Sequence, residues 1–222
     1  MPDKLITVIM STYNESEEYI TLAVNSILNQ SYSNIEFIIV CDNPNNNEIK
    51  SLLGHFQKED KRIVIIENTQ NIGLAESLNK AISISRGEYI ARMDADDISH
   101  PRRLEVEVAF LEDNPDYGVV YTARQDIDEK GYKKDTSLLC PKNDKALLSS
   151  LSYGSIISHP TVMIRKKDLS VVGGYQNFPT GQDYDLWLRF RQKGIKFHFI
   201  NQVLFYYRIR QNSIFECGAG MR

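Results

Sequence analysis

The chain has 222 residues, of which 42% are hydrophobic and 25% are charged, and its formal net charge is −3. These values are typical of one globular domain and exclude a disordered or fibrous chain. Because there is no basic excess, we do not expect a general nucleic-acid-binding protein. No apolar stretch reaches the ~18 residues that a membrane-spanning helix requires, and no signal peptide precedes the first apolar segment.

Three cysteines, Cys41, Cys140 and Cys217, lie far apart and form no CxxC pair. This pattern indicates reduced thiols rather than a zinc site or a redox motif. Together with the absence of an apparent membrane span, it predicts a soluble cytoplasmic domain.

The first hundred residues alternate between short apolar runs and segments whose apolar side chains recur at helical spacing. Such runs are typical of strands buried on both faces, and consecutive strands joined by helices lie parallel. Asn14 and Glu17 have the spacing of a capping box for the first helix. The predicted strands are residues 5–10, 35–40, 63–66 and 89–93, and the predicted helices cover 20–28, 49–56 and 74–82.

The second half of the chain is less regular, with no repeat, low-complexity tract or linker. We therefore expect a single domain over residues 1–222, with an α/β fold whose mostly parallel sheet is flanked by helices. The elements predicted for this half are helices at 104–111 and 183–193, strands at 119–123, 161–164, 197–200 and 203–209, and a hairpin or loop at 126–135.

Polar groups follow three of the predicted strands, at residues 11–15, 41–43 and 94–97. Ligands of open parallel sheets bind at the carboxyl ends of the strands, so we expect these groups to share one crevice. That crevice would hold an aromatic ring, several carboxylates and a helix N-terminus.

The third group, DADD at 94–97, contains three carboxylates. They repel one another unless a cation lies among them, and Mg²⁺ takes one or two protein carboxylates together with substrate phosphates. The group therefore indicates a metal–diphosphate site. The alternative is a solvated acidic turn that caps the helix near Pro101.

Asp42 and Tyr13 are the other candidates for contacts to a nucleotide. Asp42 either accepts a hydrogen bond from a base or ribose or forms an Asx turn, and Tyr13 either stacks on a nucleobase or is an ordinary half-buried aromatic. No P-loop, HExxH, GxSxG or strand-linked dinucleotide fingerprint is present. A nucleotide held by carboxylates, an aromatic ring and a metal is the chemistry that remains.

Four ordered blocks of the chain resemble the family 2 glycosyltransferases, which have the GT-A fold and include bacterial enzymes of the capsule and O-antigen type. The resemblance covers nearly the whole chain, and four blocks together are far more specific than a lone DxD. The blocks are TVIMSTYNE at 7–15, NIGLAESLNKA at 71–81, RGEYIARMDADD at 86–97 with PRRL at 101–104, and GQDYDLWLR at 181–189.

The resemblance implies a nucleotide-sugar-binding half at 1–100 and a smaller, mixed-strand acceptor-binding half at 101–222. It places Asp96 and Asp94 on Mn²⁺ or Mg²⁺ and makes Asp183 the general base, although an Asp before a helical face is also a common N-cap. It implies nucleotide contacts from Ser11, Tyr13, Glu15, Asp42, Asn71, Gly73, Asp94 and Ala95.

Two positions depart from the pattern of the family. Gln182 replaces the Glu that often precedes the base, and Arg210 replaces a histidine that often closes the final segment. Arg208 and Arg210 are candidates for contacts to the diphosphate. His159 is a further candidate near the site, although a lone histidine before a proline is more often structural.

The function that the resemblance implies is inverting, metal-dependent hexosyl transfer from a UDP- or dTDP-sugar to a saccharide or lipid-linked saccharide in polysaccharide or glycolipid synthesis. It leaves open a peripheral association with the inner face of the cell membrane. A nucleotidyltransferase and a non-catalytic nucleotide-sugar-binding subunit are the alternatives. The first lacks its basic Gly-rich loop in residues 11–15, and the intact DxD and Asp183 argue against the second.

Overall fold

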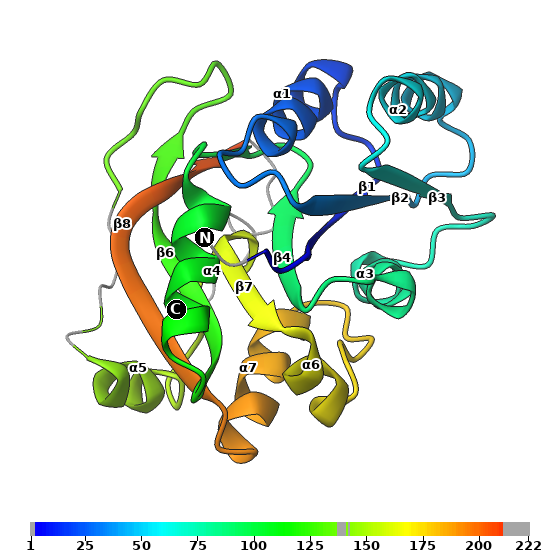
Figure 1. Cartoon of the computed structure of the whole chain (residues 1–222). Helices are drawn as coiled ribbons and strands as arrows, with labels where there is room; N and C mark the ends of the chain where they lie inside the picture. Colours follow the sequence, from blue (N-terminus) through cyan, green and yellow to red (C-terminus); the bar gives the residue numbers. More distant parts are fainter. Residues whose placement is uncertain (1–2, 137–140, 142, 211–222) are drawn as a thin grey trace.

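The computed structural model describes residues 3–136, 141 and 143–210, and Figure 1 draws the others as a thin grey trace. In this part of the chain, eight strands form one sheet in the order β3-β2-β1-β4-β7-β6-β8-β5. Cys41 is free and buried, whereas Cys140 and Cys217 lie outside the described residues.

The predicted alternation of strands and helices in the first hundred residues is confirmed. The four strands are parallel neighbours, because β1 pairs with both β2 and β4, and β2 pairs with β3. The elements are β1 (Ile6–Thr12), α1 (Glu17–Leu28), β2 (Ile35–Cys41), α2 (Asn47–Glu59), β3 (Ile63–Glu67), α3 (Leu74–Ile84) and β4 (Tyr89–Asp94).

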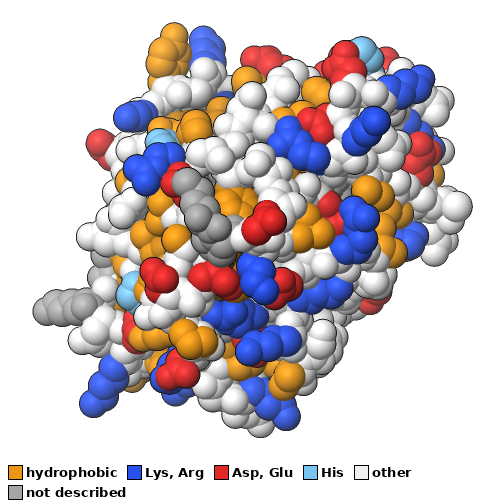
Figure 2. All heavy atoms as spheres, viewed as in Figure 1, with side chains coloured by type: hydrophobic (Ala, Val, Ile, Leu, Met, Phe, Trp, Pro, Cys, Tyr) orange, Lys and Arg blue, Asp and Glu red, His pale blue; other side chains and the backbone are white. Residues whose placement is uncertain are grey.

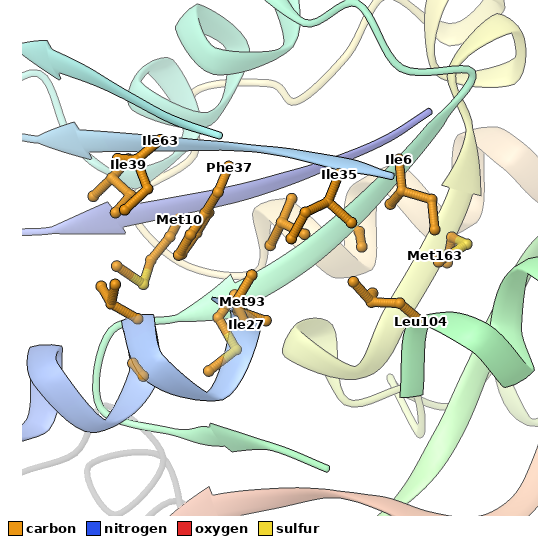
Figure 3. Packing of buried hydrophobic residues seen from close by; sticks show 14 of the residues in the cluster. Ile6, Met10, Ile27, Ile35, Phe37, Ile39, Ile63, Met93, Leu104 and Met163 are labelled. Atoms are coloured by element: carbon orange, nitrogen blue, oxygen red, sulfur yellow. The ribbon is translucent and has the colours of Figure 1, made fainter. Parts of the chain in front are cut away.

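Helices cover both faces of this sheet, with α1 and α2 on one face and α3 on the other (Figure 1). Strands alternate their side chains between the two faces, so the apolar runs of β1 and β2 fill two separate cores. Ile9 and Ile38 pack with α3, whereas Met10 and Phe37 pack under α1 together with Ile27 (Figure 3). Each such fully buried side chain contributes about 1.5–3 kcal/mol to folding.

The first helix begins differently from the prediction. Its N-cap is Ser16, whose hydroxyl accepts a hydrogen bond from the Tyr19 amide at 3.3 Å. Asn14 lies two residues earlier, and its side-chain oxygen accepts a hydrogen bond from Asn43 at 2.7 Å. The predicted capping box is therefore wrong, and Asn14 instead joins the loops that follow β1 and β2.

The second half extends the same sheet with mixed strand directions. β7 is antiparallel to β4 and β6, while β8 is parallel to β6 and antiparallel to β5. The elements are β5 (Ile98–Ser99), α4 (Arg103–Asp113), β6 (Tyr117–Ile127), α5 (Asp144–Ser150), a 3-10 turn (His159–Thr161), β7 (Val162–Arg165), α6 (Lys166–Val172), α7 (Gln182–Gln192) and β8 (Lys196–Arg208).

Two predicted boundaries in this half are wrong. Residues 197–200 and 203–209 were predicted as separate strands, but the single strand β8 contains all of them except Ile209. β6 continues to Ile127, so the predicted loop at 126–135 begins two residues later. The short elements β5, α5 and α6 were not predicted.

Acidic and basic side chains are interspersed over the face of the molecule drawn in Figure 2, in keeping with the small net charge. Among the described residues, no helix is both long enough and apolar enough to cross a membrane.

Candidate active site

The three polar groups that follow β1, β2 and β4 meet at one edge of the sheet, as predicted. In the parallel register Ser11 lies opposite Asp94, and Thr12 lies opposite Cys41. The amide of Asp42 donates a hydrogen bond to the Thr12 carbonyl at 2.8 Å. The first two groups are therefore joined directly, and the third begins beside Ser11.

The loop after β1 is ordered by its own carboxylate. Glu15 accepts hydrogen bonds from the Thr12 hydroxyl and the Tyr13 amide, both at 2.8 Å. The Tyr13 side chain is 43% exposed. This exposure fits a half-buried aromatic, and it also leaves part of the ring available for stacking on a flat ligand.

Asp42 is buried and binds the loop that precedes α3. One carboxylate oxygen accepts hydrogen bonds from Asn68 at 2.8 Å and the Ile72 amide at 2.9 Å, and the other accepts one from the Gly73 amide at 2.8 Å. Its partners lie about 30 positions away, so the Asx-turn interpretation is wrong. A carboxylate has about four acceptor positions, which leaves one for a ligand.

The same loop depends on a glycine. Gly73 has φ +83°, a conformation that L side chains rarely adopt, and it begins α3 without a side-chain cap. Asn71 accepts a second hydrogen bond from the Gly73 amide at 2.9 Å. Asn71 and Gly73 therefore lie beside Asp42, at the edge where the sequence places a nucleotide.

The DADD group does not cap the next helix. α4 has Arg102 as its N-cap residue, with no side-chain cap bond. Asp94 instead pairs with Arg92, Asp96 pairs with Arg210 at 2.7 Å, and the buried Asp97 accepts a hydrogen bond from the Arg208 amide at 2.7 Å. The acidic-turn alternative is therefore wrong.

Two carboxyls of this group have raised pKa values. Burial, with the charge of Asp94 as the second cause, raises the pKa of Asp96 to about 6. Burial and both neighbouring carboxylates raise the pKa of Asp97 well above its ordinary value. A cation would favour the charged form of Asp96.

Asp94 and Asp96 therefore suit a hard divalent cation, although the described residues hold no group of three or more His, Cys, Asp or Glu side chains arranged around such an ion. Two carboxylates are sufficient for Mg²⁺ or Mn²⁺, because Mg²⁺ keeps several waters and takes substrate phosphate oxygens.

Two arginines hold the DADD group in place: Arg92, which sequence reasoning missed, and Arg208, which it named only as a candidate contact to the diphosphate. Arg92 is 1% exposed within β4 and contacts Asp94 through one nitrogen. Arg208, also buried, donates to the Asp96 carbonyl at 2.7 Å and to the carbonyls of Asp128 and Glu129 at 3.0 Å. The sequence contained one signal, since an arginine inside a buried apolar strand requires a partner.

Asp183 is the second residue of α7 and is half-buried. The N-cap is Gly181, with φ +75° and no side-chain cap bond, so the N-cap interpretation of Asp183 is wrong. Burial raises the pKa of Asp183, hydrogen bonds from the amides of Tyr184 and Asp183 lower it, and the charge of Asp94 raises it. Asp183 and Asp94 are therefore within electrostatic range, although they come from different halves of the chain.

The side chain of His159 is buried against aromatic residues, which favours a structural role. Its ring lies 2.8 Å from the Tyr175 hydroxyl and makes an edge contact with Trp187 at 6.1 Å between ring centroids. Burial lowers the pKa of His159 well below its ordinary value. Asn79 fixes Tyr175 through two hydrogen bonds, at 2.8 and 2.9 Å. These contacts support the structural interpretation of His159.

Comparisons with known proteins test the family resemblance. The model of the family "Glycosyl transferase family 2" matches residues 7–173. An uncharacterised glycosyltransferase of Methanocaldococcus jannaschii is 37% identical over 209 residues, which cover 94% of this chain and 72% of the relative. An O-antigen biosynthesis glycosyltransferase of Escherichia coli is 34% identical over 213 residues, which cover 94% of this chain and 81% of the relative.

Two solved structures share the fold. S. aureus TarS superimposes with a TM-score of 0.73 at 17% identity, and the match covers 91% of this chain. A mannosyltransferase of Pyrobaculum calidifontis, solved with GDP-Man and Mn²⁺, has a TM-score of 0.74 at 19% identity over 94% of this chain. The chain spans 60% and 58% of these two solved chains. The sequence match and the shared GT-A fold lead to one conclusion: the chain belongs to glycosyltransferase family 2.

Proposed function

We propose that the protein transfers a hexose from a nucleotide-diphosphate sugar to a hydroxyl acceptor, with inversion at the anomeric carbon, in polysaccharide or glycolipid biosynthesis. One observation carries this proposal: a half-buried carboxyl with a raised pKa, Asp183, lies within electrostatic range of the Asp94 carboxylate at the ligand-binding edge of the sheet. Relatives named for O-antigen and amylovoran biosynthesis support the pathway class.

In this proposal the first half of the chain binds the leaving diphosphate, and the second half supplies the base that deprotonates the acceptor. Mn²⁺ or Mg²⁺, when bound by Asp94 and Asp96, stabilises the negative charge that develops on the leaving diphosphate. Asp183 takes the proton of the acceptor hydroxyl as that oxygen attacks the anomeric carbon. One base and one displacement invert the configuration at this carbon.

Residues of the first half bind the nucleotide. The exposed ring of Tyr13 stacks on the base, with Ser11 near the end of β1 and Glu15 on the same loop as further contacts. Asp42 has one acceptor position left, which suits the lone ring N–H of uracil or thymine better than the adjacent ring N–H and amino group of guanine. We therefore favour a UDP- or dTDP-sugar, whereas the mannosyltransferase solved with Mn²⁺ was solved with GDP-Man.

The two alternatives have weaker support. A nucleotidyltransferase needs basic groups to hold a triphosphate, but the loop after β1 is organised by the carboxylate of Glu15. A non-catalytic binding subunit has no need for a carboxyl with the burial and raised pKa of Asp183.

The test is a panel of UDP-, dTDP- and GDP-sugars with Mn²⁺, in which release of the nucleoside diphosphate is followed with and without simple sugar acceptors. We expect release with at least one uridine or thymidine donor, and loss of that release in Asp183→Asn. Pyrophosphate release from a nucleoside triphosphate and a sugar phosphate would identify a nucleotidyltransferase instead. Donor binding without turnover under any condition would identify a binding subunit.

A further inference from the structure

Each of the two carboxylates that suit a metal is paired with an arginine. Asp94 pairs with Arg92, and the Oδ2 atom of Asp96 lies 2.7 Å from a terminal nitrogen of Arg210. Two positive charges therefore offset two negative charges. A divalent cation that approaches this pair of ligands gains little from their charge while both arginines remain in place.

The two arginines differ in how freely their side chains can move away from the carboxylates. Arg92 belongs to the central strand β4 and is 1% exposed. Arg210 follows the end of β8, and its side chain is 34% exposed. The backbone next to it is fixed by a hydrogen bond from the Ile209 amide to the Ile127 carbonyl at 2.9 Å. The backbone therefore keeps the Arg210 side chain near Asp96, and its partly exposed guanidinium is the one that can move.

The guanidinium of Arg210 also has an unused donor. Its Nε–H is buried and has no hydrogen-bond partner among residues 3–136, 141 and 143–210. A buried donor without an acceptor costs free energy that a ligand oxygen would recover. The planar fork of guanidinium donors suits two phosphate oxygens.

We infer that Arg210 is an exchangeable counter-ion of Asp96, which occupies this carboxylate until a divalent cation replaces it and then donates to the diphosphate of the donor. The inference rests on the proposed function, because it takes a nucleotide diphosphate and a cation as the ligands of this edge. Arg210 is thus a residue that couples metal binding to donor binding.

This exchange has a measurable thermodynamic consequence. Without a diphosphate, Mn²⁺ must compete with Arg210 for Asp96, so the wild-type protein binds the ion weakly. A diphosphate offers Arg210 another partner and strengthens Mn²⁺ binding, and by reciprocity Mn²⁺ strengthens diphosphate binding by the same factor. Removal of the positive charge at position 210 abolishes the competition and weakens this coupling.

The first measurement is the affinity for Mn²⁺ alone, from the electron paramagnetic resonance signal of the free ion. We expect Arg210→Gln to bind Mn²⁺ at least about tenfold more tightly than the wild type, and Arg210→Lys, which keeps the charge, to stay near it. Arg102→Gln is the matched control, because Arg102 is exposed and its ion-pair partner is Glu105, which is not a proposed ligand. The Arg102 Nε and Glu105 Oε2 atoms are 3.4 Å apart. Equal or weaker Mn²⁺ binding in Arg210→Gln overturns the inference.

The second measurement is calorimetric titration with UDP, and with GDP in parallel, at a saturating concentration of Mn²⁺, which frees Arg210 from Asp96. Arg210→Gln should bind the diphosphate about tenfold more weakly, whereas Arg102→Gln should match the wild type. Unchanged affinity in Arg210→Gln contradicts the proposed contact to the diphosphate.

Asp96→Ala separates this inference from the proposed function. If Asp96→Ala loses Mn²⁺ binding and Arg210→Gln gains none, the metal site stands and the exchange of Arg210 is wrong. If the wild type binds no Mn²⁺ even with saturating UDP or GDP, both the metal site and the exchange are wrong.

Discussion

Asp183→Asn removes the basicity of the proposed proton acceptor and leaves its surroundings nearly unchanged. Asparagine has almost the same size, and its amide oxygen can accept the hydrogen bonds that the amides of Asp183 and Tyr184 donate. Gly181, not Asp183, is the N-cap of α7. The raised pKa shows that burial disfavours the charged carboxylate, so a neutral side chain should change stability by less than about 1 kcal/mol.

The expected loss of turnover is large in comparison. Loss of a general base typically lowers turnover by about 10²–10⁴-fold, which corresponds to roughly 3–5 kcal/mol of transition-state stabilisation. Donor affinity should barely change, because the proposed nucleotide contacts belong to the first half of the chain. The assay combines initial rates of nucleoside diphosphate release, calorimetric donor titration and thermal unfolding of both proteins.

The pH profile gives an independent test. A protonated carboxyl cannot accept the acceptor's proton, so wild-type activity should fall as the pH decreases through the raised pKa of Asp183. This acidic limb should lie above the ordinary aspartate value and should disappear in Asp183→Asn. Near-normal turnover in a folded Asp183→Asn protein would refute the reasoning and would direct the search to Asp185, although Asp185 already forms an ion pair with Arg189 at 2.8 Å.

Three further changes test other parts of the structure. Asp96→Ala should abolish Mn²⁺-dependent donor binding without unfolding the protein, and unchanged Mn²⁺-dependent affinity in titrations would contradict its role as a ligand. UDP and dTDP should bind more tightly than GDP, and Tyr13→Ala should weaken UDP binding by about 1–3 kcal/mol; tighter GDP binding would reject the assignment of the base site. Burial raises the pKa of Glu107 to about 8 despite Arg103 at 3.7 Å, so the free energy of unfolding should fall by at most about 4 kcal/mol as the pH rises from about 5 to 9. Glu107→Gln should flatten this dependence in denaturant titrations, and an equally steep fall in the variant would disprove it.

The sequence was sufficient to predict the first half of the fold and the edge where the site lies. Buried parallel strands appear as short apolar runs, and the connections between them contain recognisable helical faces. Once the four strands are parallel, the residues after β1, β2 and β4 must meet at one edge. The register that places Ser11 opposite Asp94 confirms this expectation.

The second half shows where such patterns fail. Asn201 and Gln202 are exposed and interrupt the apolar pattern of β8, so the sequence predicts two strands. In the structure Ile200 pairs with Thr122 and Val203 with Ala123, so a bulge accommodates both polar residues without breaking the strand. Helices α5 and α6 have seven residues each, too few for a helical period to be distinguished.

Ion pairs between distant positions could not be predicted. Nothing in the local sequence around Asp96 indicates Arg210, and Asp42 gives no sign that its partners are the amides of Ile72 and Gly73. These contacts depend on how the chain returns to the sheet edge. The strand ends and the family resemblance therefore predicted most side chains of the site, though not Arg92, whereas their pairing required the structure.

The pairing of β5 with β8 has a kinetic consequence. Ser99 and Phe205 are neighbours in the sheet, yet closing the loop between them joins positions roughly a hundred residues apart, which delays such a contact during folding. Asp97 and Arg208 sit at the same junction. The strands of the first half can assemble early from local connections. The acidic loop after β4 reaches its final conformation only after β8 has paired with β5. A refolding experiment should therefore recover secondary structure before it recovers the ability to bind Mn²⁺.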